Sequence, residues 1–160
     1  MADAQPQTPQ ATDTPALLIE KIYVKDLSLE NPGSPQSFLI QESPEIEVSL
    51  RTRGEQIQDG TYECVLTVTV TAKVGDKTLF LVEASQAGVF QIRNVKPIEI
   101  QPLMGVHCPT LLFPYVRETI ADAVTRAGFP PVHLNPINFE AIYQQQLAGM
   151  QQPAMSPAAN

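Results

Sequence analysis

The chain has 160 residues, and 43% of them are hydrophobic, which suits one globular domain rather than a chain that is disordered throughout. Its formal net charge is −7, so we expect no binding to nucleic acid, because a phosphate backbone requires a surface rich in Lys and Arg. The N-terminus has neither the basic nor the apolar region of a signal peptide, and no apolar run approaches the roughly 20 residues that span a bilayer. We therefore expect a cytoplasmic protein without direct membrane insertion.

Both ends of the chain are rich in Gln, Pro and Ala, and the N-terminal end also contains several Thr residues. Such segments bury too little apolar area to offset the conformational entropy that ordering removes. We therefore expect residues 1–15 and 149–160 to be disordered tails, and residues 16–148 to form the folded domain.

The first half of the chain predicts four β-strands. The segment ALLIEKIYVKDLSLE (16–30) is rich in β-branched and aromatic residues and ends at an Asn-Pro-Gly turn. EIEVSLR (45–51) and TYECVLTVTVTAKV (61–74) alternate apolar and polar residues, which indicates strands with one buried face. A turn then leads into LFLVEASQAGVF (79–90), which completes an antiparallel meander.

The register of the last hairpin decides where Glu83 points. A two-residue loop would pair Val68 with Glu83 and bury the carboxylate without a partner, which is unfavourable by several kcal/mol. A loop longer by one residue closes Val74 against Thr78 and turns Leu81 and Glu83 to the outer face. The pairs expected from it are Ala72 with Phe80, Val70 with Val82 and Val68 with Ala84. We predict this second register because it suits both strands.

The second half predicts helices after a long connection. Residues 93–112 contain Pro97, Pro102, Pro109 and Gly105 and are expected to form an irregular crossover loop. A helix is expected from Pro114 to Gly128, with a narrow, small-residue stripe suited to packing against another helix. A second helix is expected to begin near Asn135 or Asn138. The predicted fold is α+β, with a four-stranded antiparallel sheet and two C-terminal helices.

No catalytic or metal-binding motif is recognisable in the sequence. It contains no GxSxG, P-loop, GxGxxG or HExxH motif. His107 and His133 lack metal-ligand spacing, and Cys108 has no evident orienting acid. Cys64 lies on the apolar face of its strand, and the two cysteines suggest neither a zinc site nor a disulfide. We therefore expect no enzyme activity, no cofactor and no metal.

Apolar residues are in surplus for a chain of this size. The segment LMGVHCPTLLFPY (103–115) and the last helix carry more large apolar side chains than one sheet face and two helices cover. This surplus indicates oligomer contacts, a groove for apolar segments, or both.

Several segments share their order and spacing with one protein family. They are IYVKDLSLENP, YECVLTVTVTA, LFLVEASQAGVF, HCPTLLFPYVRETIADAV and PINFEAIYQQQL. Over about residues 17–148 the chain resembles the SecB protein-export chaperones. The resemblance implies a homotetramer, built as a dimer of dimers, that holds unfolded precursor proteins without ATP. It also implies delivery of these clients to the SecA motor, with the first long helix at the dimer–dimer interface.

The resemblance also implies three sets of functional residues. Positions matching contacts with the basic, zinc-binding tail of SecA are Asp26, Glu30, Leu81 and Glu83. Positions expected in the client groove are Leu103, Met104, Leu112, Phe113, Phe139, Ile142 and Tyr143. Positions expected to support oligomer assembly are Phe80, Val82, Ala84, Gln86, Val116, Ile120 and Val124. The zinc belongs to the partner, and acids here would steer its encounter more than supply affinity.

The chain departs from the family at one point, and two other readings stay open. Family members often carry a Trp where this chain has Glu42, so this segment brings no such aromatic group to the groove. One alternative is a small-ligand carrier or enzyme with a closed pocket between helix and sheet. The other is a structural oligomer whose interfaces consume all the apolar surface. A continuous, solvent-open groove would favour the chaperone.

Overall fold

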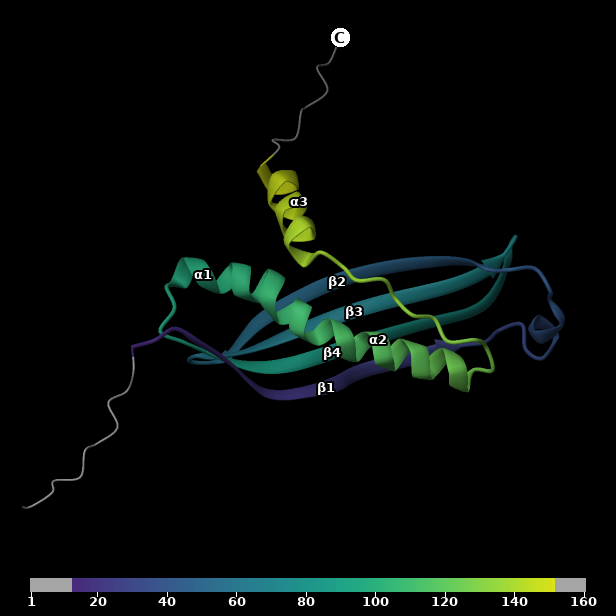
Figure 1. Cartoon of the computed structure of the whole chain (residues 1–160), viewed down its shortest axis with the longest axis horizontal. Helices are drawn as coiled ribbons and strands as arrows, with labels where there is room; N and C mark the ends of the chain where they lie inside the picture. The colour runs from purple at the N-terminus through teal and green to yellow at the C-terminus, as the bar shows by residue number, and fades with distance from the viewer. Residues whose placement is uncertain (1–12, 152–160) are drawn as a thin grey trace, which may run out of the picture.

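The computed structural model describes residues 13–151 and contains one antiparallel sheet (Figure 1). Its strands are β1 (Ala16–Glu30), β2 (Glu45–Gln58), β3 (Thr61–Val74) and β4 (Lys77–Arg93), in the spatial order β1-β4-β3-β2. The four predicted strands are confirmed, although β2 continues well beyond residue 51. The expected meander is wrong for β1, which pairs with β4 at the edge of the sheet rather than with β2. Most of the two expected tails, residues 1–12 and 152–160, lies outside the described residues.

The inner face of the sheet forms the core. Along β3 the inward side chains Cys64, Leu66, Val68, Val70 and Ala72 are all 0% exposed, as their alternation predicts. A short 3-10 helix, η1 (Gln36–Leu39), interrupts the connection between β1 and β2.

The β3–β4 hairpin has the predicted register, with a different turn. Ala72 pairs with Phe80, Val70 with Val82 and Val68 with Ala84, so Leu81 and Glu83 lie on the outer face. Val74, however, pairs with Lys77 across a two-residue turn rather than with Thr78. The register shifts between Ala72 and Lys73, which leaves Leu79 as an additional residue in β4. A β-bulge therefore supplies the extra residue that a longer loop was predicted to supply.

The predicted crossover loop is wrong, because most of it is helical. The segments α1 (Pro97–Pro102), the π-helical η2 (Leu103–His107) and α2 (Cys108–Arg126) follow one another without interruption. Pro97 and Pro109 occupy the first turns of α1 and α2, where proline is tolerated. Pro102 directly precedes the π-helical turn, where the α-helical hydrogen-bond pattern already ends. Prolines in these places do not end the helical run. The helix expected from Pro114 therefore begins earlier, at Cys108, and Pro114 lies inside it.

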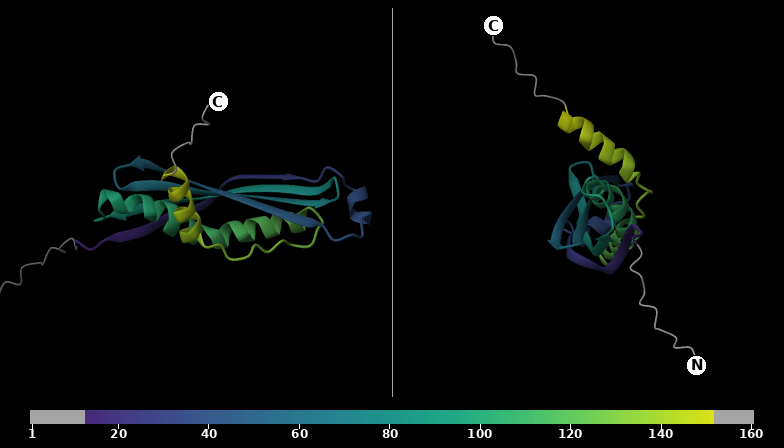
Figure 2. Two further views of the ribbon diagram at one scale, coloured as in Figure 1. Left: turned by 90° about the horizontal axis from the view of Figure 1, so that it is seen from above. Right: turned by 90° about the vertical axis from the view of Figure 1, so that its left-hand side faces the viewer.

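The last helix, α3 (Phe139–Gln151), begins at the second of the two predicted positions. The side-chain Oδ1 of Asn138 accepts a hydrogen bond from the backbone N–H of Ala141 at 3.0 Å and so caps the helix. Helix α3 projects away from the sheet next to β2 and crosses the direction of α2 (Figures 1 and 2). Within residues 13–151, no helix is both long and apolar enough to cross a bilayer.

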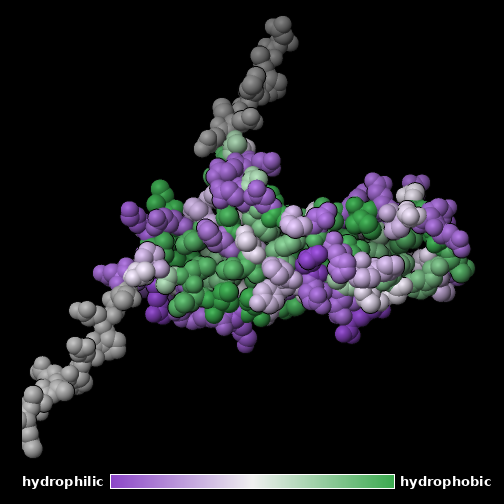
Figure 3. Space-filling view, viewed as in Figure 1, coloured by the Kyte–Doolittle hydropathy of each residue, from purple (hydrophilic) through white to green (hydrophobic). Residues whose placement is uncertain are grey.

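Helix α2 covers the two central strands and leaves parts of both edge strands exposed on the inner face. Large apolar side chains there are 39–47% exposed. On β1 they are Ile19, Val24, Leu27 and Leu29, which we call the β1 strip. On β2 they are Ile46 and Val48, which we call the β2 strip. Figure 3 shows hydrophobic side chains gathered on this face around the start of α2.

Candidate functional site: an apolar groove and a charged sheet face

A cavity of about 540 Å³ lies where the ends of β2 and β3, the helical turns α1 and η2, and helix α3 meet. Its apolar lining consists of Tyr62, Pro97, Ile100, Met104, Phe139, Ile142, Tyr143, Leu147 and Met150. Polar groups, including Thr52, Glu55, Gln56, Gln101 and Gln146, complete the wall. Because Met150 is 82% exposed and its polar neighbours are exposed as well, the cavity opens to solvent as a groove.

Two glycines allow the walls of this groove to approach each other. A Cβ atom on Gly54 of β2 would lie 2.8 Å from Cε of Met104, and one on Gly105 would lie 2.6 Å from Cδ2 of Tyr143. Real Cβ atoms do not approach other heavy atoms so closely. The π-helical turn η2 therefore packs closely against β2 on one side and α3 on the other. A side chain at residue 105 would clash with the ring of Tyr143, whereas one at residue 54 would displace only the flexible end of Met104.

The structure brings four of the seven predicted groove residues together in this cavity. Met104, Phe139, Ile142 and Tyr143 line it. Leu103 and Phe113 pack partly buried against the core, and the ring of Phe113 lies 6.0 Å from that of Phe139. Leu112 is 0% exposed, so it belongs to the core rather than to the groove surface.

Sequence reasoning missed the wall formed by the end of β2 and by α1. The segment after Arg51 contains a glycine and several polar residues, which hid the continuation of the strand to Gln58. Ile100 was assigned to an irregular loop because of its neighbouring prolines. Leu147 was recognisable as part of the apolar stripe of α3, since it follows Tyr143 at helical spacing.

The outer face of the sheet brings the four predicted SecA-contact residues together. Glu30 pairs with Leu81, Ser28 with Glu83, and Asp26 with Ser85, so these side chains lie on one face of neighbouring strands. The carboxylate of Glu83 accepts a hydrogen bond from the Thr69 hydroxyl at 2.7 Å. One guanidinium nitrogen of Arg51 lies 3.6 Å from the other carboxylate oxygen.

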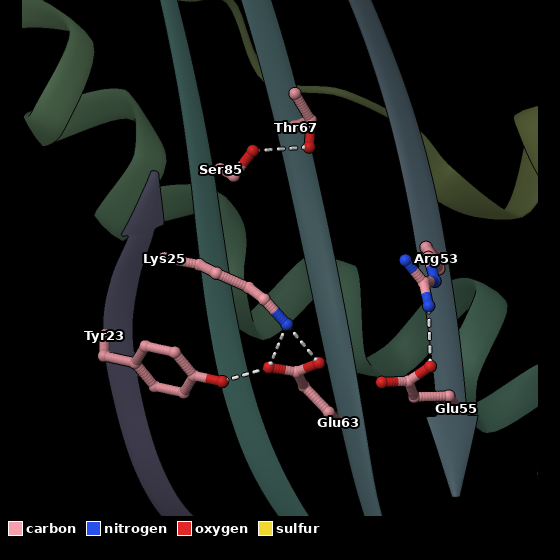
Figure 4. A network of polar contacts seen from close by, with 7 residues as sticks. All are labelled: Tyr23, Lys25, Arg53, Glu55, Glu63, Thr67 and Ser85. Carbon is pink, nitrogen blue, oxygen red and sulfur yellow. Dashed lines mark hydrogen bonds and ion pairs between the residues drawn. The ribbon is translucent and has the colours of Figure 1, made fainter. Parts of the chain in front are cut away.

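A polar network next to this site connects β1 with β3 across β4 (Figure 4). Lys25 Nζ lies 2.7 Å from the carboxylate of Glu63, and the Tyr23 hydroxyl donates to the same carboxylate. The side chain of Glu63 is only 8% exposed. Burial acts to raise the pKa of Glu63, but the hydrogen bonds from Lys25 and Tyr23 outweigh it and hold the pKa below its usual value. Burial and the Glu63 carboxylate raise the pKa of Tyr23 to about 12.

The seven predicted assembly residues all lie in the core of the single chain. Phe80, Val82, Ala84, Gln86, Val116, Ile120 and Val124 are at most 3% exposed. The stripe on α2 thus packs against its own sheet, and the prediction that it suits another helix is wrong. The exposed apolar residues of α2 are instead Leu111 and Tyr115, at 37% and 50%. Gln86 accepts a hydrogen bond from Thr119 of α2 at 3.2 Å, which satisfies a buried amide.

The cysteines and histidines form no chemical site in the part of the chain that the structure describes. Cys64 and Cys108 are free thiols with 0% exposure, consistent with a packing role for Cys64. Contact with Cys108 and burial both raise the pKa of Cys64, which keeps the thiol protonated. Residues 13–151 contain no cluster of His, Cys, Asp and Glu suited to a metal ion.

Comparison with known proteins decides between the remaining readings. The family model described as preprotein translocase subunit SecB matches residues 10–150. The chain belongs to the SecB family. Protein-export protein SecB of Methylobacillus flagellatus is 57% identical over 143 residues, which cover 89% of this chain and 91% of that protein. SecB of Chromobacterium violaceum is 60% identical over 134 residues, covering 84% of this chain and 89% of the relative.

A solved structure shares the fold at low sequence identity. It is a SecB-like chaperone of Mycobacterium tuberculosis in complex with a peptide from an antitoxin. Its TM-score is 0.63 at 12% identity, and the match covers 76% of this chain and 91% of the other. The resemblance expected from the sequence is therefore confirmed, and this SecB protein is a protein-export chaperone.

Proposed function

We propose that this protein binds unfolded precursor proteins in its apolar groove without ATP, as a cytoplasmic homotetramer, and delivers them to SecA. The observation that carries the proposal is the solvent-open cavity of about 540 Å³ with an apolar lining. A closed pocket with convergent polar groups, as a small-ligand carrier or enzyme requires, differs from this arrangement.

The lining suits clients of many sequences. Met104 and Met150 are unbranched and flexible, so they adapt to side chains of different shape. Tyr143 is half-buried and offers an aromatic surface, whereas Phe139 is buried in the wall of the groove. The amides of Gln101 and Gln146 can exchange hydrogen bonds with the backbone of an extended chain, a group that every client shares. Binding of this kind selects for apolar content rather than for a particular sequence.

The uncovered surfaces support assembly into a dimer of dimers. The inner face of β1 exposes the β1 strip, and β1 is an edge strand of the sheet that residues 13–151 form. Leu111 and Tyr115 add exposed apolar area on α2. Covering these residues with further copies of the chain removes apolar surface from water. We expect light scattering at micromolar concentration to give the mass of four chains.

The outer face supports contact with SecA while a client is bound. Asp26, Glu30, Glu83 and Leu81 lie on the face of the sheet opposite to α2 and to the groove. A basic tail docked there leaves the groove accessible. Complementary charge would accelerate the encounter and fix the orientation of the partner.

An aggregation assay tests the holding function. A denatured, slow-folding precursor is diluted into buffer that contains the purified protein and no ATP. Ile142→Asp places a charge in the groove, and we expect the concentration for half suppression of aggregation to rise by roughly an order of magnitude. Ala141→Asp, an exposed neighbour outside the groove, is the matched control. No suppression by the unmodified protein, or equal loss in both variants, would contradict the proposal.

A further inference from the structure

The acids of the proposed docking face differ in their contacts. Within residues 13–151, Asp26 and Glu30 form no ion pair, whereas Glu83 lies 3.6 Å from the guanidinium of Arg51. Glu83 is also held by the Thr69 hydroxyl at 2.7 Å, so its position does not depend on Arg51. The side chain of Glu83 is 31% exposed, which leaves it accessible to a partner.

Arg51 lies at the edge of this face, on the strand beyond β3. It stands opposite Thr67 in the β2–β3 pairing, while Glu83 stands opposite Thr69, so the guanidinium reaches diagonally over β3. Its side chain is 70% exposed. A shallow cavity of about 250 Å³ is lined by both Arg51 and Asp26. A positive charge thus lies beside the carboxylate of Glu83 and lines the same cavity as Asp26.

We propose that Arg51 competes with the basic segment of the partner for the carboxylate of Glu83. The proposal rests on docking of the SecA tail at Glu83. In the free protein Arg51 occupies one oxygen of that carboxylate, and an arriving cation must displace it. Exposed ion pairs at such distances are weak, so displacement is feasible and lowers the affinity without preventing binding. Arg51 therefore favours a partner with several positive charges. One of these charges displaces Arg51 at Glu83, and Asp26 and Glu30 attract the others.

Arg53 provides a matched control on the same strand and face. It carries the same charge two residues further along β2, but its guanidinium lies 2.7 Å from Glu55 and contacts no carboxylate of the docking face. Lys25, the third cation near the cavity, is paired with Glu63. Substitution of Arg51 or Arg53 removes the same net charge, so any difference between the two variants measures the competition at Glu83.

The test is a titration of the zinc-loaded SecA tail, as a purified peptide, into the full-length protein. We expect Arg51→Gln to bind the tail roughly two- to fivefold more tightly than the unmodified protein in low salt. The gain should largely vanish at about 0.5 M salt, where charges at this separation are screened. Arg53→Gln should change the affinity by clearly less. Equal gains in both variants, no gain, or weaker binding of Arg51→Gln would overturn the proposal.

A second pair of variants separates this proposal from the docking function on which it depends. Glu83→Gln alone should weaken binding of the tail. Adding Arg51→Gln to it should not restore the affinity, because the carboxylate for which Arg51 competes is no longer present. If Glu83→Gln binds the tail with the same affinity as the unmodified protein, docking at Glu83 is refuted, and the proposed competition is refuted as well. If Glu83→Gln weakens binding but Arg51→Gln brings no gain, docking stands and only the role of Arg51 is refuted.

Discussion

The charged outer face and the apolar groove are assembled in different ways. The contacts of the outer face join strands of one sheet, either adjacent strands, as in Glu83 with Thr69, or strands one apart, as in Arg51 with Glu83. The groove instead joins elements that are far apart in the sequence, with η2 fitted between β2 and α3. A pattern of alternation is enough to assign these side chains to the outer face, although the pairing of β1 with β4 is itself long-range. The groove depends in addition on the packing of helices against the sheet. The charged face should therefore tolerate substitution, and the groove should be sensitive to small changes in shape.

The largest difference in expected effect is between two adjacent residues of β4, Val82 on the inner face and Glu83 on the outer face. Val82 is 0% exposed, and we expect Val82→Asp to lower the free energy of unfolding by more than about 3 kcal/mol, since it buries a carboxylate without a partner. Glu83→Lys on the opposite face should change it by less than about 0.5 kcal/mol and preserve the oligomer, while weakening SecA binding. Urea unfolding and light scattering measure both variants. Loss of the oligomer in Glu83→Lys would show that residue 83 faces a subunit contact.

A single added methyl group at residue 105 should disturb the packing of the groove wall. In Gly105→Ala the new Cβ would meet the ring of Tyr143 at 2.6 Å, so α3 or the ring must move. We expect the packing of α3 to weaken by about 1–3 kcal/mol, offset in part by the roughly 1 kcal/mol that alanine gains in a helix. Hydrogen exchange of the α3 amides should accelerate and client holding should fall, while the sheet keeps its protection.

Gly149→Ala is the control for this change, because a Cβ there meets nothing within 4 Å. It should leave exchange in α3 unchanged or slower, since alanine favours the helix. Equal acceleration in both variants would show that the contact between η2 and α3 does not position the groove wall.

The sequence predicted the strands well because their information is local. The alternation in TYECVLTVTVTAKV assigned each side chain of β3 to a face, and the need to keep Glu83 out of the core selected the register. The bulge at Leu79 could not be predicted, because a longer loop and a bulge after a tight turn give the same faces.

The helical run and half of the groove were less predictable. Pro102 and Pro109 predict breaks in a helix, whereas a π-helical turn between them accommodates both. The apolar stripe of α2 fits either a sheet or a second helix, and only the fold shows that it covers β3 and β4. The roles of Gly54 and Gly105 could not be recognised in the sequence, because the side chain that each glycine contacts lies on a distant element.

The smallest expected effect concerns the network that joins β1 to β3. Since the pKa of Glu63 is lowered in the folded protein, its contribution to stability is complete above the usual value of 4.5 and is lost as the pH falls through the lowered pKa. Since the pKa of Tyr23 is raised from 10.0 to about 12, its contribution is complete below pH 10 and is lost between there and about pH 12. Lys25 is 46% exposed, so solvent screening should limit the acid loss to about 1 kcal/mol.

Urea unfolding of the unmodified protein and of Glu63→Gln across this pH range measures both losses. The variant should start from a lower stability at pH 7 and lose less of it toward acid. Its alkaline loss should also shrink, because the Glu63 carboxylate contributes to the raised pKa of Tyr23. Identical pH profiles for the two proteins would mean that the carboxylate does not hold β1 to β3. The outer face would then depend on strand pairing alone, and its charged groups would be free to serve docking only.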